Sequence, residues 1–511
     1  MVLATADTAE ALEINHASCT KQSDNELRFD CDVETDVAAT VRIDFCDATE
    51  NGTSCTKDRS TIDVQGTYHT ASCHAPLLTC WKYDVPVWGL IESHDHEWAA
   101  VAEKGASSHA LGGTDFTSGT LADELGYISA TTSMAPVETE FILLNYGCGS
   151  GTVQADHAII MNTDGDVIWY EDVRDVTGDS GAWIRAIRVD KPSQNVMVVV
   201  DNDWYIEYDR SGEVIASLER DAGDFEDAAG VDRHVHHDVY KKGGELFLVT
   251  AHEETWEEEA KHGSCNGDGD TDDSFTYIVD GIMVFDSDYN YDRDWSMTDA
   301  FPAEECHFFE TSTGPGYWWG TYTNKDWVHA NSIFVDADAD WLISLNHPSV
   351  VVEIDGSTGA ANWALHGDNT ETGEGDWDIV SSPTVTPDDF NKQHHAWWTV
   401  DDTMMLFDNR LDEAEDSRGI EIEFDSGNSE FDIIDEWDTG FDCPATGSTF
   451  DILPRGNILT TCSKEGSRND KITEFARSTG SKAYELTLTC ATGSGYNHNT
   501  SLYRAEPIGL D

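Results

Sequence analysis

The chain has 511 residues, of which 99 are acidic and 29 are Lys or Arg, so its formal net charge at pH 7 is −70. Because nucleic acid and anionic lipid are negatively charged themselves, this balance excludes DNA, RNA and anionic membrane surfaces as partners. The length allows about two to four domains, or one large β domain beside a smaller one. We interpret the charge as that of solvated acidic loops rather than of a surface for one specific partner.

The cysteines indicate an oxidising compartment. Their number, 12, is even, half of them lie before residue 81, and no Cys-x-x-Cys motif occurs. This pattern favours disulfides over zinc ligation and predicts a secreted or periplasmic protein. The chain has no apolar run of about eighteen residues, so no membrane span is predicted. It also has no signal-peptide pattern, so we expect any export signal to have been removed. Spacing does not define the connectivity, and the local pairs that we consider are Cys73–Cys80, Cys265–Cys306 and Cys443–Cys462.

The first third of the chain shows strand periodicity only. Residues 1–22 are polar and without pattern, and we expect a loose N-terminus there. Over residues 23–110, short runs of alternating polar and apolar residues are separated by turn residues. This pattern predicts a small β-sandwich of the immunoglobulin or fibronectin type, stapled by disulfides. A stretch rich in Gly, Ser and Thr, 105–119, is interpreted as a linker.

Residues 125–511 contain a repeat that is loose in sequence and regular in pattern. Each unit ends in a hairpin with a tight turn of the kind that Gly favours. Such four-stranded units without intervening helices predict an all-β fold, a six-bladed β-propeller. The strand at 140–145 has no upstream partner and the run 499–508 has no hairpin, so we expect them to complete one blade and close the ring. The hairpins are 159–169, 204–218, 281–295, 350–363, 419–437 and 471–486.

Histidines recur at the start of equivalent strands. In a propeller the first strand of each blade lines the channel, so we expect these side chains to converge at one mouth. Grouped neutral imidazoles can ligate a transition metal or act as nucleophile and general acid or base, and both uses stay open from the residues alone. We expect Asn331 and Asn409 to donate hydrogen bonds to an oxyanion, and Trp327 and Trp397 to form an aromatic wall. The candidate histidines are His236, His237, His329, His394 and His395, with His498 before the closing strand.

Four motifs carry a resemblance to a known family. They are His-His-Asp at 236–238, Asp-Trp-Val-His-Ala-Asn-Ser at 326–332, Gln-His-His-Ala at 393–396 and Phe-Asp-Asn at 407–409. At these residues the chain resembles the bacterial arylsulfate sulfotransferases, six-bladed propellers preceded by a small β-sandwich. The resemblance implies transfer of a sulfuryl group from a small aromatic sulfate donor to a phenolic acceptor, with no cofactor required for the chemistry.

The resemblance also implies roles for the histidines. His394 would be the nucleophile that carries the sulfuryl group as a sulfohistidine, and His329 would polarise or protonate the sulfate. One of His236 and His237 would serve as acid or base for the phenol oxygens, and the motif does not distinguish them. The physical sense is that a neutral imidazole attacks sulfur while neighbouring donors offset charge on the sulfate oxygens.

One position departs from the family pattern. Where the family has an arginine that grips the sulfate, this chain reads Ser-Leu-Asn-His at 344–347, so Asn346 replaces the guanidinium and His347 follows it. A charge-assisted Arg–sulfate contact is about twice as strong as a neutral one. Two alternatives therefore stay beside the enzyme: an inactive extracellular propeller that serves as a binding or structural assembly module, and a transition-metal site in the funnel. A homo-oligomer or an extracellular assembly is also left open.

An acidic insertion at 252–276 is a candidate calcium loop. Asp268, Asp270 and Asp272 are separated by one Gly and one Thr, and calcium loops place their oxygen ligands at every second residue in the same way. The terminal glutamate of a full EF-hand loop is absent from its place. The alternative is a flexible acidic loop without a bound ion.

Overall fold

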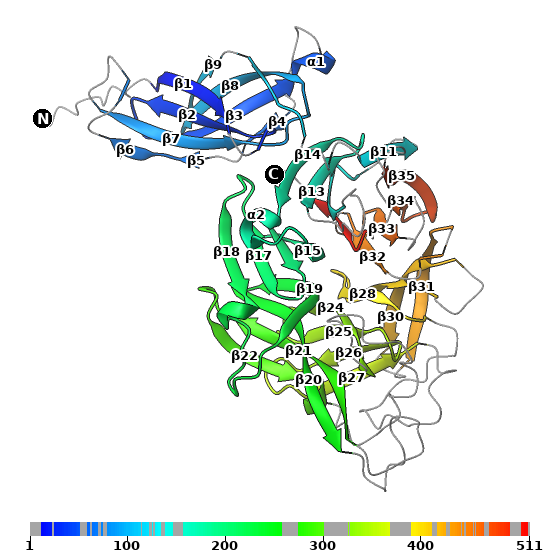
Figure 1. Ribbon diagram of the computed structural model, residues 1–511. Helices are drawn as coiled ribbons and strands as arrows, with labels where there is room; N and C mark the ends of the chain where they lie inside the picture. The colour runs from blue at the N-terminus through cyan, green and yellow to red at the C-terminus, as the bar shows by residue number, and fades with distance from the viewer. Residues whose placement is uncertain are drawn as a thin grey trace, which may run out of the picture.

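The structure, a computed structural model, is built almost wholly from β-strands (Figure 1). Its described helices are single turns: α1 (Ala48–Asn51), α2 (Arg174–Thr177), the 3-10 turn η2 (Arg220–Ala222) and α3 (Met297–Ala300). In this described part of the chain, no helix has the length and apolar character that crossing a membrane requires. The described residues are 12–22, 25–51, 59–61, 64–69, 73–74, 79–113, 115–121, 125, 128–133, 138–146, 157–257, 274–300, 325–326, 328–367, 390–410, 416–425, 430–440, 442–443, 446–452, 454, 456–463, 470–490 and 502–508.

The N-terminal part forms two sheets that share one core. Alternate residues of their strands are buried, as in β3 (Thr40–Asp47), where Val41, Ile43 and Phe45 share a core with Tyr83 and Val85 of β7 (Cys80–Val87). The first sheet has the order β1 (Ile14–Lys21), β2 (Phe29–Thr35), β7 (Cys80–Val87), β6 (Thr67–His69). The second has the order β10 (Phe116–Thr117), β8 (Asp95–Lys104), β3 (Thr40–Asp47), β4 (Arg59–Ser60), with β5 (Val64–Gln65) on β3 and β9 (Ser107–Gly112) on β8.

The expectation of a loose terminus over residues 1–22 is wrong for the segment that forms β1. This strand pairs with β2 along its length, and a disulfide joins Cys19 to Cys31 across the pair. Its side chains are mostly half-buried or exposed, because β1 is an edge strand. A polar edge strand has no apolar alternation, which is why the sequence pattern did not reveal it.

Disulfides are present as the cysteine count predicts. The predicted pairs Cys73–Cys80 and Cys443–Cys462 are both formed, and no described cysteine is free. The third predicted pair, Cys265–Cys306, lies outside the described residues.

The rest of the chain forms six sheets among the described residues. Each predicted hairpin coincides with a pair of neighbouring antiparallel strands. In chain order, with the innermost strand first, the first three sheets are β36 (Ala505–Ile508), β12 (Phe141–Asn145), β13 (His157–Asn162), β14 (Val167–Asp172); β15 (Ile184–Asp190), β16 (Asn195–Val200), β17 (Trp204–Tyr208), β18 (Val214–Glu219); and β19 (His234–Lys242), β20 (Glu245–Glu257), β21 (Ser274–Phe285), β22 (Tyr291–Ser296), with β23 (Lys325–Asp326) beside β21. The last three are β24 (Ala330–Val335), β25 (Trp341–Leu345), β26 (Val350–Ile354), β27 (Ala361–His366); β28 (His394–Trp398), β29 (Met404–Asp408), β30 (Arg418–Asp425), β31 (Glu430–Asp438); and β32 (Thr446–Asp451), β33 (Ile458–Ser463), β34 (Asp470–Ala476), β35 (Ser481–Cys490), β11 (Ile128–Ser133).

The inner strands of these sheets contact one another in a closed ring. β15 contacts β19, followed by β24, β28 and β32, and both β32 and β15 contact β36. The C-terminal strand β36 pairs antiparallel with β12, so the two ends of this part of the chain share one sheet. Figure 1 shows the sheets following one another around a centre, from teal through green and yellow to red. The arrangement is therefore all-β and propeller-like, and we refer to these six sheets as the ring.

Tryptophans after the hairpin turns connect neighbouring sheets of the ring. Trp169 of β14 donates its indole hydrogen to Arg210 O in the next sheet's hairpin at 3.1 Å. Trp295 of β22 does the same to Gly359 O at 2.8 Å. Gly359 has a φ of +73°, which glycine adopts without strain. These contacts fill the gaps between neighbouring sheets of the ring.

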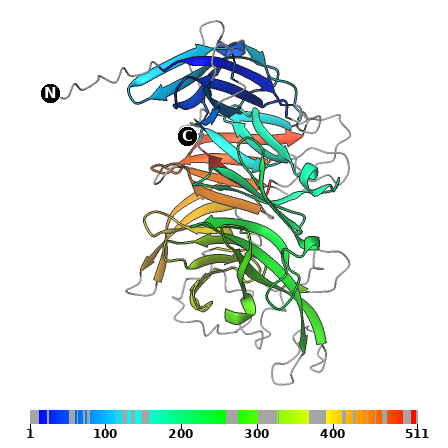
Figure 2. The ribbon, with the colours of Figure 1, turned by 90° about the vertical axis from the view of Figure 1, so that its left-hand side faces the viewer.

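Arg28 joins the N-terminal sheets to the ring. Its guanidinium donates to Ser211 O at 2.8 Å and to Tyr170 O at 3.1 Å, and it forms an ion pair with Glu171. Figure 2 shows the N-terminal sheets stacked on the end of the ring where the cyan and red strands lie. The two parts therefore have a defined polar junction.

Candidate functional site

The histidines predicted to converge lie where inner strands of the ring are distorted. The register shifts between Val235 and Val239 in β19, at Ala330 in β24 and after His394 in β28. His237, His329 and His395 have positive φ values of 54°, 54° and 53°. Such values are uncommon for residues other than glycine and cost about 1–3 kcal/mol each. Because a bulge changes the direction in which side chains leave a strand, the repeated distortion determines where these imidazoles point.

The structure brings the predicted histidines from three sheets together, and we call this group the histidine cluster: His236, His237, His329, His347 and His394. The ring centres of His237 and His329 are 4.5 Å apart, and those of His329 and His347 are 4.7 Å apart. Tyr503, just before β36, lies with its ring centre 5.7 Å from that of His237 and 6.3 Å from that of His394. Tyr503 therefore connects His394 to the rest of the cluster.

His236 and His237 share a hydrogen bond. Their Nδ1 atoms are 2.6 Å apart, so one of the two nitrogens donates and the other accepts. His236 Nε2 lies 3.0 Å from Asp280 Oδ1, and the other oxygen of Asp280 accepts the backbone N–H of Ala330 at 3.1 Å. Asp280 thus connects the histidine pair of β19 to the start of β24.

The tautomer of His394 follows from its neighbour. Asn409 donates its amide N–H to Cys443 O at 2.6 Å, so its Oδ1 faces His394 Nδ1 at 2.8 Å. An amide oxygen only accepts, so His394 Nδ1 carries the hydrogen. The lone pair of the neutral ring then lies on Nε2.

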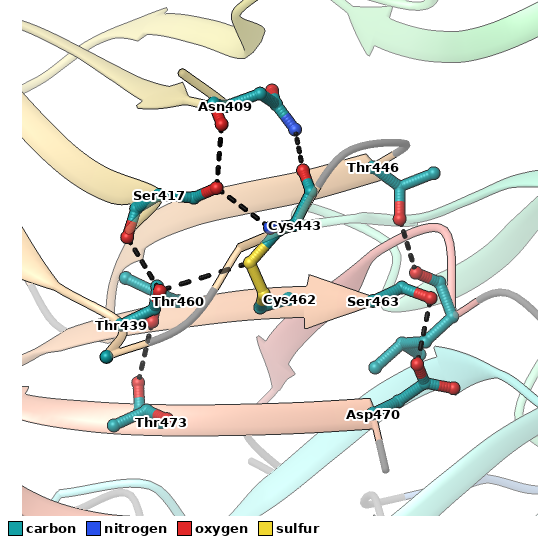
Figure 3. The surroundings of a disulfide bond; sticks show 12 residues. Asn409, Ser417, Thr439, Cys443, Thr446, Thr460, Cys462, Ser463, Asp470 and Thr473 are labelled. Carbon is teal, nitrogen blue, oxygen red and sulfur yellow. Dashed lines mark hydrogen bonds between the residues drawn. A yellow bond between two sulfur atoms is a disulfide. The ribbon is translucent and has the colours of Figure 1, made fainter. Parts of the chain in front are cut away.

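The orientation of Asn409 depends on a disulfide-linked loop (Figure 3). Ser417 Oγ donates to Asn409 O at 2.7 Å and accepts the Cys443 N–H at 2.9 Å. Cys443 is linked to Cys462 on β33. The loop that carries Cys443 is therefore tied to the neighbouring sheet, and through Asn409 it fixes the ring of His394.

Burial makes the central imidazoles weak bases. It lowers the pKa of His394 to about 4, although the hydrogen bond with Asn409 opposes this shift. Burial, reinforced by the neighbouring imidazoles of His329, His236 and His394, holds the pKa of His237 well below its usual value. His394 and His237 are therefore neutral at pH 7, which leaves a nitrogen lone pair for nucleophilic attack.

His395, the second histidine of the 393–396 motif, lies outside the cluster. It is fully buried, its Nδ1 lies 3.0 Å from Thr449 O, and its ring centre is 4.1 Å from that of Phe450. Burial lowers its pKa well below the usual value. His395 therefore packs against β32 instead of joining the histidine cluster.

The predicted amide donors, Asn331 and Asn409, both donate to backbone carbonyls, Asn409 to Cys443 O as described above, and the amide of Asn346 does the same. Asn331 is fully buried and donates to Gln393 O at 2.7 Å. Asn346 donates to Lys392 O at 2.8 Å, which ties β25 to the segment that precedes β28. These amides support the start of the 393–396 motif, and we expect their role to be positional.

Some predicted site residues lie elsewhere or are not described. Trp397 is not brought to the histidine cluster: its indole N–H donates to Thr449 O at 2.8 Å, and its side chain lines a separate cavity. Trp397 and His395 are two residues apart and both contact Thr449 O, as strand alternation predicts, so Trp397 faces away from His394. The residues outside the description are Trp327, His498, Asp268, Asp270 and Asp272.

Arg185 and Tyr503 are cluster neighbours that the sequence reasoning missed. Arg185 lies on β15 at a register irregularity like that of the histidine strands, and its guanidinium carbon is 3.3 Å from the centre of the Trp183 ring. Burial lowers the pKa of Arg185 to about 9, so it is still charged at pH 7. Its charge contributes to the lowered pKa of His237. The signal in the sequence is a polar side chain at the start of an inner strand, the same position that the histidines occupy.

The cluster does not have the geometry of a preformed metal site. Among the described residues, the only three ligand atoms of His, Cys, Asp or Glu that lie within 4.8 Å of one another belong to Glu34, Cys73 and Cys80. Two of these are joined in a disulfide. No described group of three histidine nitrogens converges in this way.

The buried histidines predict a loss of stability in acid. The unfolded chain, with histidine pKa values near 6.5, binds protons before the folded chain does, so stability is complete above about pH 6.5 and falls as the pH drops toward 4. For His394 alone, the free energy of unfolding should fall by about 3 kcal/mol between these two pH values. We expect this difference on comparing the urea unfolding free energies of the wild type and His394→Asn at about pH 7.5 and about pH 4.5. Carboxylates also titrate in this pH range, and the comparison with His394→Asn isolates the contribution of the imidazole. Parallel pH profiles of the two proteins would contradict the prediction.

The fold is therefore a propeller-like β structure with histidines clustered around the starts of its inner strands. The family described as Arylsulfotransferase (ASST) matches residues 128–504. The chain therefore belongs to the arylsulfotransferase family. No curated protein matches the chain.

Solved structures show only distant likenesses. A protein of unknown function from Bacteroides caccae is 9% identical, with a TM-score of 0.40, over 72% of this chain and 100% of that chain. A virginiamycin B lyase from Staphylococcus aureus is 8% identical, with a TM-score of 0.31, over 71% of this chain and 99% of that chain. The assignment of the chain therefore rests on the family match.

Proposed function

We propose that the protein transfers a sulfuryl group from a phenolic sulfate ester to a phenol through a sulfohistidine on His394. The observation that carries the proposal is the orientation of His394, whose Nδ1 is held by Asn409 so that Nε2 bears the lone pair. Membership of the arylsulfotransferase family supports the same chemistry. We also propose that the six sheets are the blades of a six-bladed propeller, preceded by a disulfide-stapled β-sandwich.

The reaction has two balanced steps. In the first, the Nε2 lone pair of His394 forms a bond to sulfur, and the bond between sulfur and the aryl oxygen breaks. The phenolate leaves and takes a proton from a neighbouring imidazolium, which becomes a neutral imidazole. In the second, the acceptor phenol gives its proton to that imidazole, its oxygen bonds to sulfur, and the N–S bond breaks. No atom changes its oxidation state, so no redox partner is needed.

The other cluster histidines supply the protons. His329 stacks on His347 and meets His237 edge-on, so it lies between these two rings, and we assign to it the donation to sulfate oxygens. The hydrogen bond between His236 and His237 allows a proton to pass from one ring to the other. We therefore assign the acid and base role for the phenol oxygens to this pair rather than to one of its members.

Arg185 is the cation that we propose for the sulfate in place of the arginine missing at Asn346. We expect Arg185→Gln to lower kcat/KM for an aryl sulfate by about 100-fold, because a charge-assisted contact to the sulfate oxygens is lost. Arg185→Lys should retain part of the activity, since it keeps the charge without the planar fork. Steady-state kinetics of both variants, with circular dichroism to check folding, test this. Full activity of a folded Arg185→Gln protein would remove Arg185 from the proposal.

The function is tested by incubating the protein with 4-nitrophenyl sulfate and a phenol and following the release of 4-nitrophenolate. Release that depends on the acceptor supports the transferase. The rival is a propeller that binds partners without turnover, which the replacement of the expected arginine by Asn346 favours. No release by the folded protein with several aryl sulfates would favour that rival. Release together with a bound transition metal that is lost on mutation of His329 would favour the metal site instead.

We further propose that the protein works outside the cytoplasm. The disulfides Cys19–Cys31, Cys73–Cys80 and Cys443–Cys462 support this, because such bonds persist in oxidising compartments. Extraction from a native source, with assay of the soluble external fraction, tests the localisation.

A further inference from the structure

A second cavity lies at the opposite ends of the inner strands from the histidine cluster. Its volume is about 260 Å³, and inner strands of all six sheets or the turns after them contribute to its wall. The cluster residues stand at the start of β19 and β28, whereas the cavity residues Tyr240 and Trp397 stand toward the ends of these strands. We call it the axial cavity.

A buried polar layer separates the axial cavity from the histidine cluster. Asp238, fully buried, forms ion pairs with Arg188 and Arg504, which come from other sheets of the ring. The buried ring of His395 packs on Phe450, whose side chain lines the cavity. None of the cluster histidines lines the axial cavity. The two sites are therefore distinct.

Aromatic rings form much of the wall of the axial cavity. Tyr240 and Phe334 lie with ring centres 5.2 Å apart, and Trp397 and Phe450 lie with ring centres 6.4 Å apart. Aromatic pairs at such separations leave faces and edges that favour another flat ring. The volume is smaller than the roughly 300–1,000 Å³ of drug-sized ligand sites, so it suits a ligand with one ring.

The same cavity carries an excess of positive charge in a strongly acidic chain. Four basic side chains line it, Arg188, Lys191, Lys241 and Lys242, against one acidic side chain, Glu506. Arg188 and Lys241 are neutralised by Asp238 and Glu207. In the described part of the chain, no ion pair joins Lys191 or Lys242 to a carboxylate. These two exposed lysines leave net positive charge at the cavity rim.

We propose that the axial cavity binds a small aromatic anion, with its ring among the four aromatic side chains and its carboxylate or sulfonate facing Lys191 and Lys242. Burial of the ring supplies the non-directional part of the affinity. The two lysines supply the preference for a negative group, because the rest of the chain repels anions. This proposal does not rest on sulfuryl transfer by the histidine cluster.

The test uses benzoate and benzenesulfonate, which are neither sulfate esters nor phenols and so cannot be turned over. Isothermal titration calorimetry of the full chain should give a dissociation constant of about 1 mM or below. The double variant Lys191→Glu/Lys242→Glu should weaken binding by about tenfold or more. Both lysines are exposed, so folding is expected to be kept, and Lys104→Glu, another exposed lysine on β8, is the matched control. His394→Ala should leave benzoate binding unchanged.

Three results would overturn the proposal. The first is an absence of benzoate binding at millimolar concentration. The second is equal binding of benzyl alcohol, which would mean that charge plays no part. The third is binding that is lost in His394→Ala and kept in the double lysine variant, which would place the ligand at the histidine cluster instead.

Discussion

Replacing His394 with alanine is expected to abolish sulfuryl transfer, with a loss of at least about 1,000-fold in kcat. The reason is chemical, since alanine offers no nucleophile for the first step and the other imidazoles of the histidine cluster belong to other sheets. The measurement is the acceptor-dependent release of 4-nitrophenolate. Because His394 is buried, the variant must also be shown to be folded, by urea unfolding at about neutral pH.

The covalent intermediate separates a nucleophile from a merely structural histidine. With donor and no acceptor, the wild type should release about one equivalent of phenolate in a burst. The peptide that contains His394 should gain the mass of one sulfuryl group. Asn409→Ala should slow the burst without removing it, because it frees the ring orientation and leaves the nucleophile in place. A burst of normal size in folded His394→Ala would mean that another residue carries the sulfuryl group.

The histidine cluster could be predicted because the repeat makes the histidines equivalent. Once hairpins recur at regular intervals, His237 and His394 fall at the starts of inner strands, and inner strands of a closed ring meet at its centre. No single motif carries this information. The inference depends on the ring, and the ring depends on the hairpin periodicity.

The contributions of Arg185 and Tyr503 could not be predicted in the same way. Neither belongs to a histidine motif, and Tyr503 reaches the cluster only because β36 crosses back to pair with β12. The predicted placement of Trp397 beside the histidines was wrong for a different reason. Trp397 lies three residues after His394, so strand alternation places the two side chains on opposite faces, and Trp397 shares its face with His395 at Thr449 O. The expectation of an aromatic wall beside His394 did not take this alternation into account.

Some edge strands were also not predicted from the sequence. β1 and β11 are both outermost in their sheets, and their exposed or half-buried residues carry little apolar alternation. β11 pairs with β35, far away in the sequence. Pairing of this kind depends on backbone hydrogen bonds, which side-chain patterns do not report.

Replacing Asp238 is expected to have the second large effect, which is on the stability of the fold rather than on the reaction. Its carboxylate is fully buried and accepts Arg188 Nε and Nη2 at 2.9 Å each, as well as Nη1 of Arg504. It also accepts the backbone N–H groups of Val239 at 2.9 Å and Ile333 at 3.0 Å. Burial alone would raise the pKa of Asp238, but the two guanidiniums outweigh it and lower the pKa. The carboxylate therefore joins β19 to three other sheets of the ring, through ion pairs with Arg188 and Arg504 and through the backbone N–H of Ile333.

We expect Asp238→Ala to lower the free energy of unfolding by about 3–5 kcal/mol, because it leaves Arg188 and Arg504 buried without their common counter-ion. Urea unfolding measures this, and Glu213→Gln, an exposed carboxylate, should change the free energy of unfolding by less than about 0.5 kcal/mol. Replacing all three charges together with apolar residues should recover most of the loss. The variant should also lower sulfuryl transfer, since Asp238 follows His237 at the bulge of β19. A loss below about 1 kcal/mol in Asp238→Ala would mean that water or another anion balances the guanidiniums in the channel.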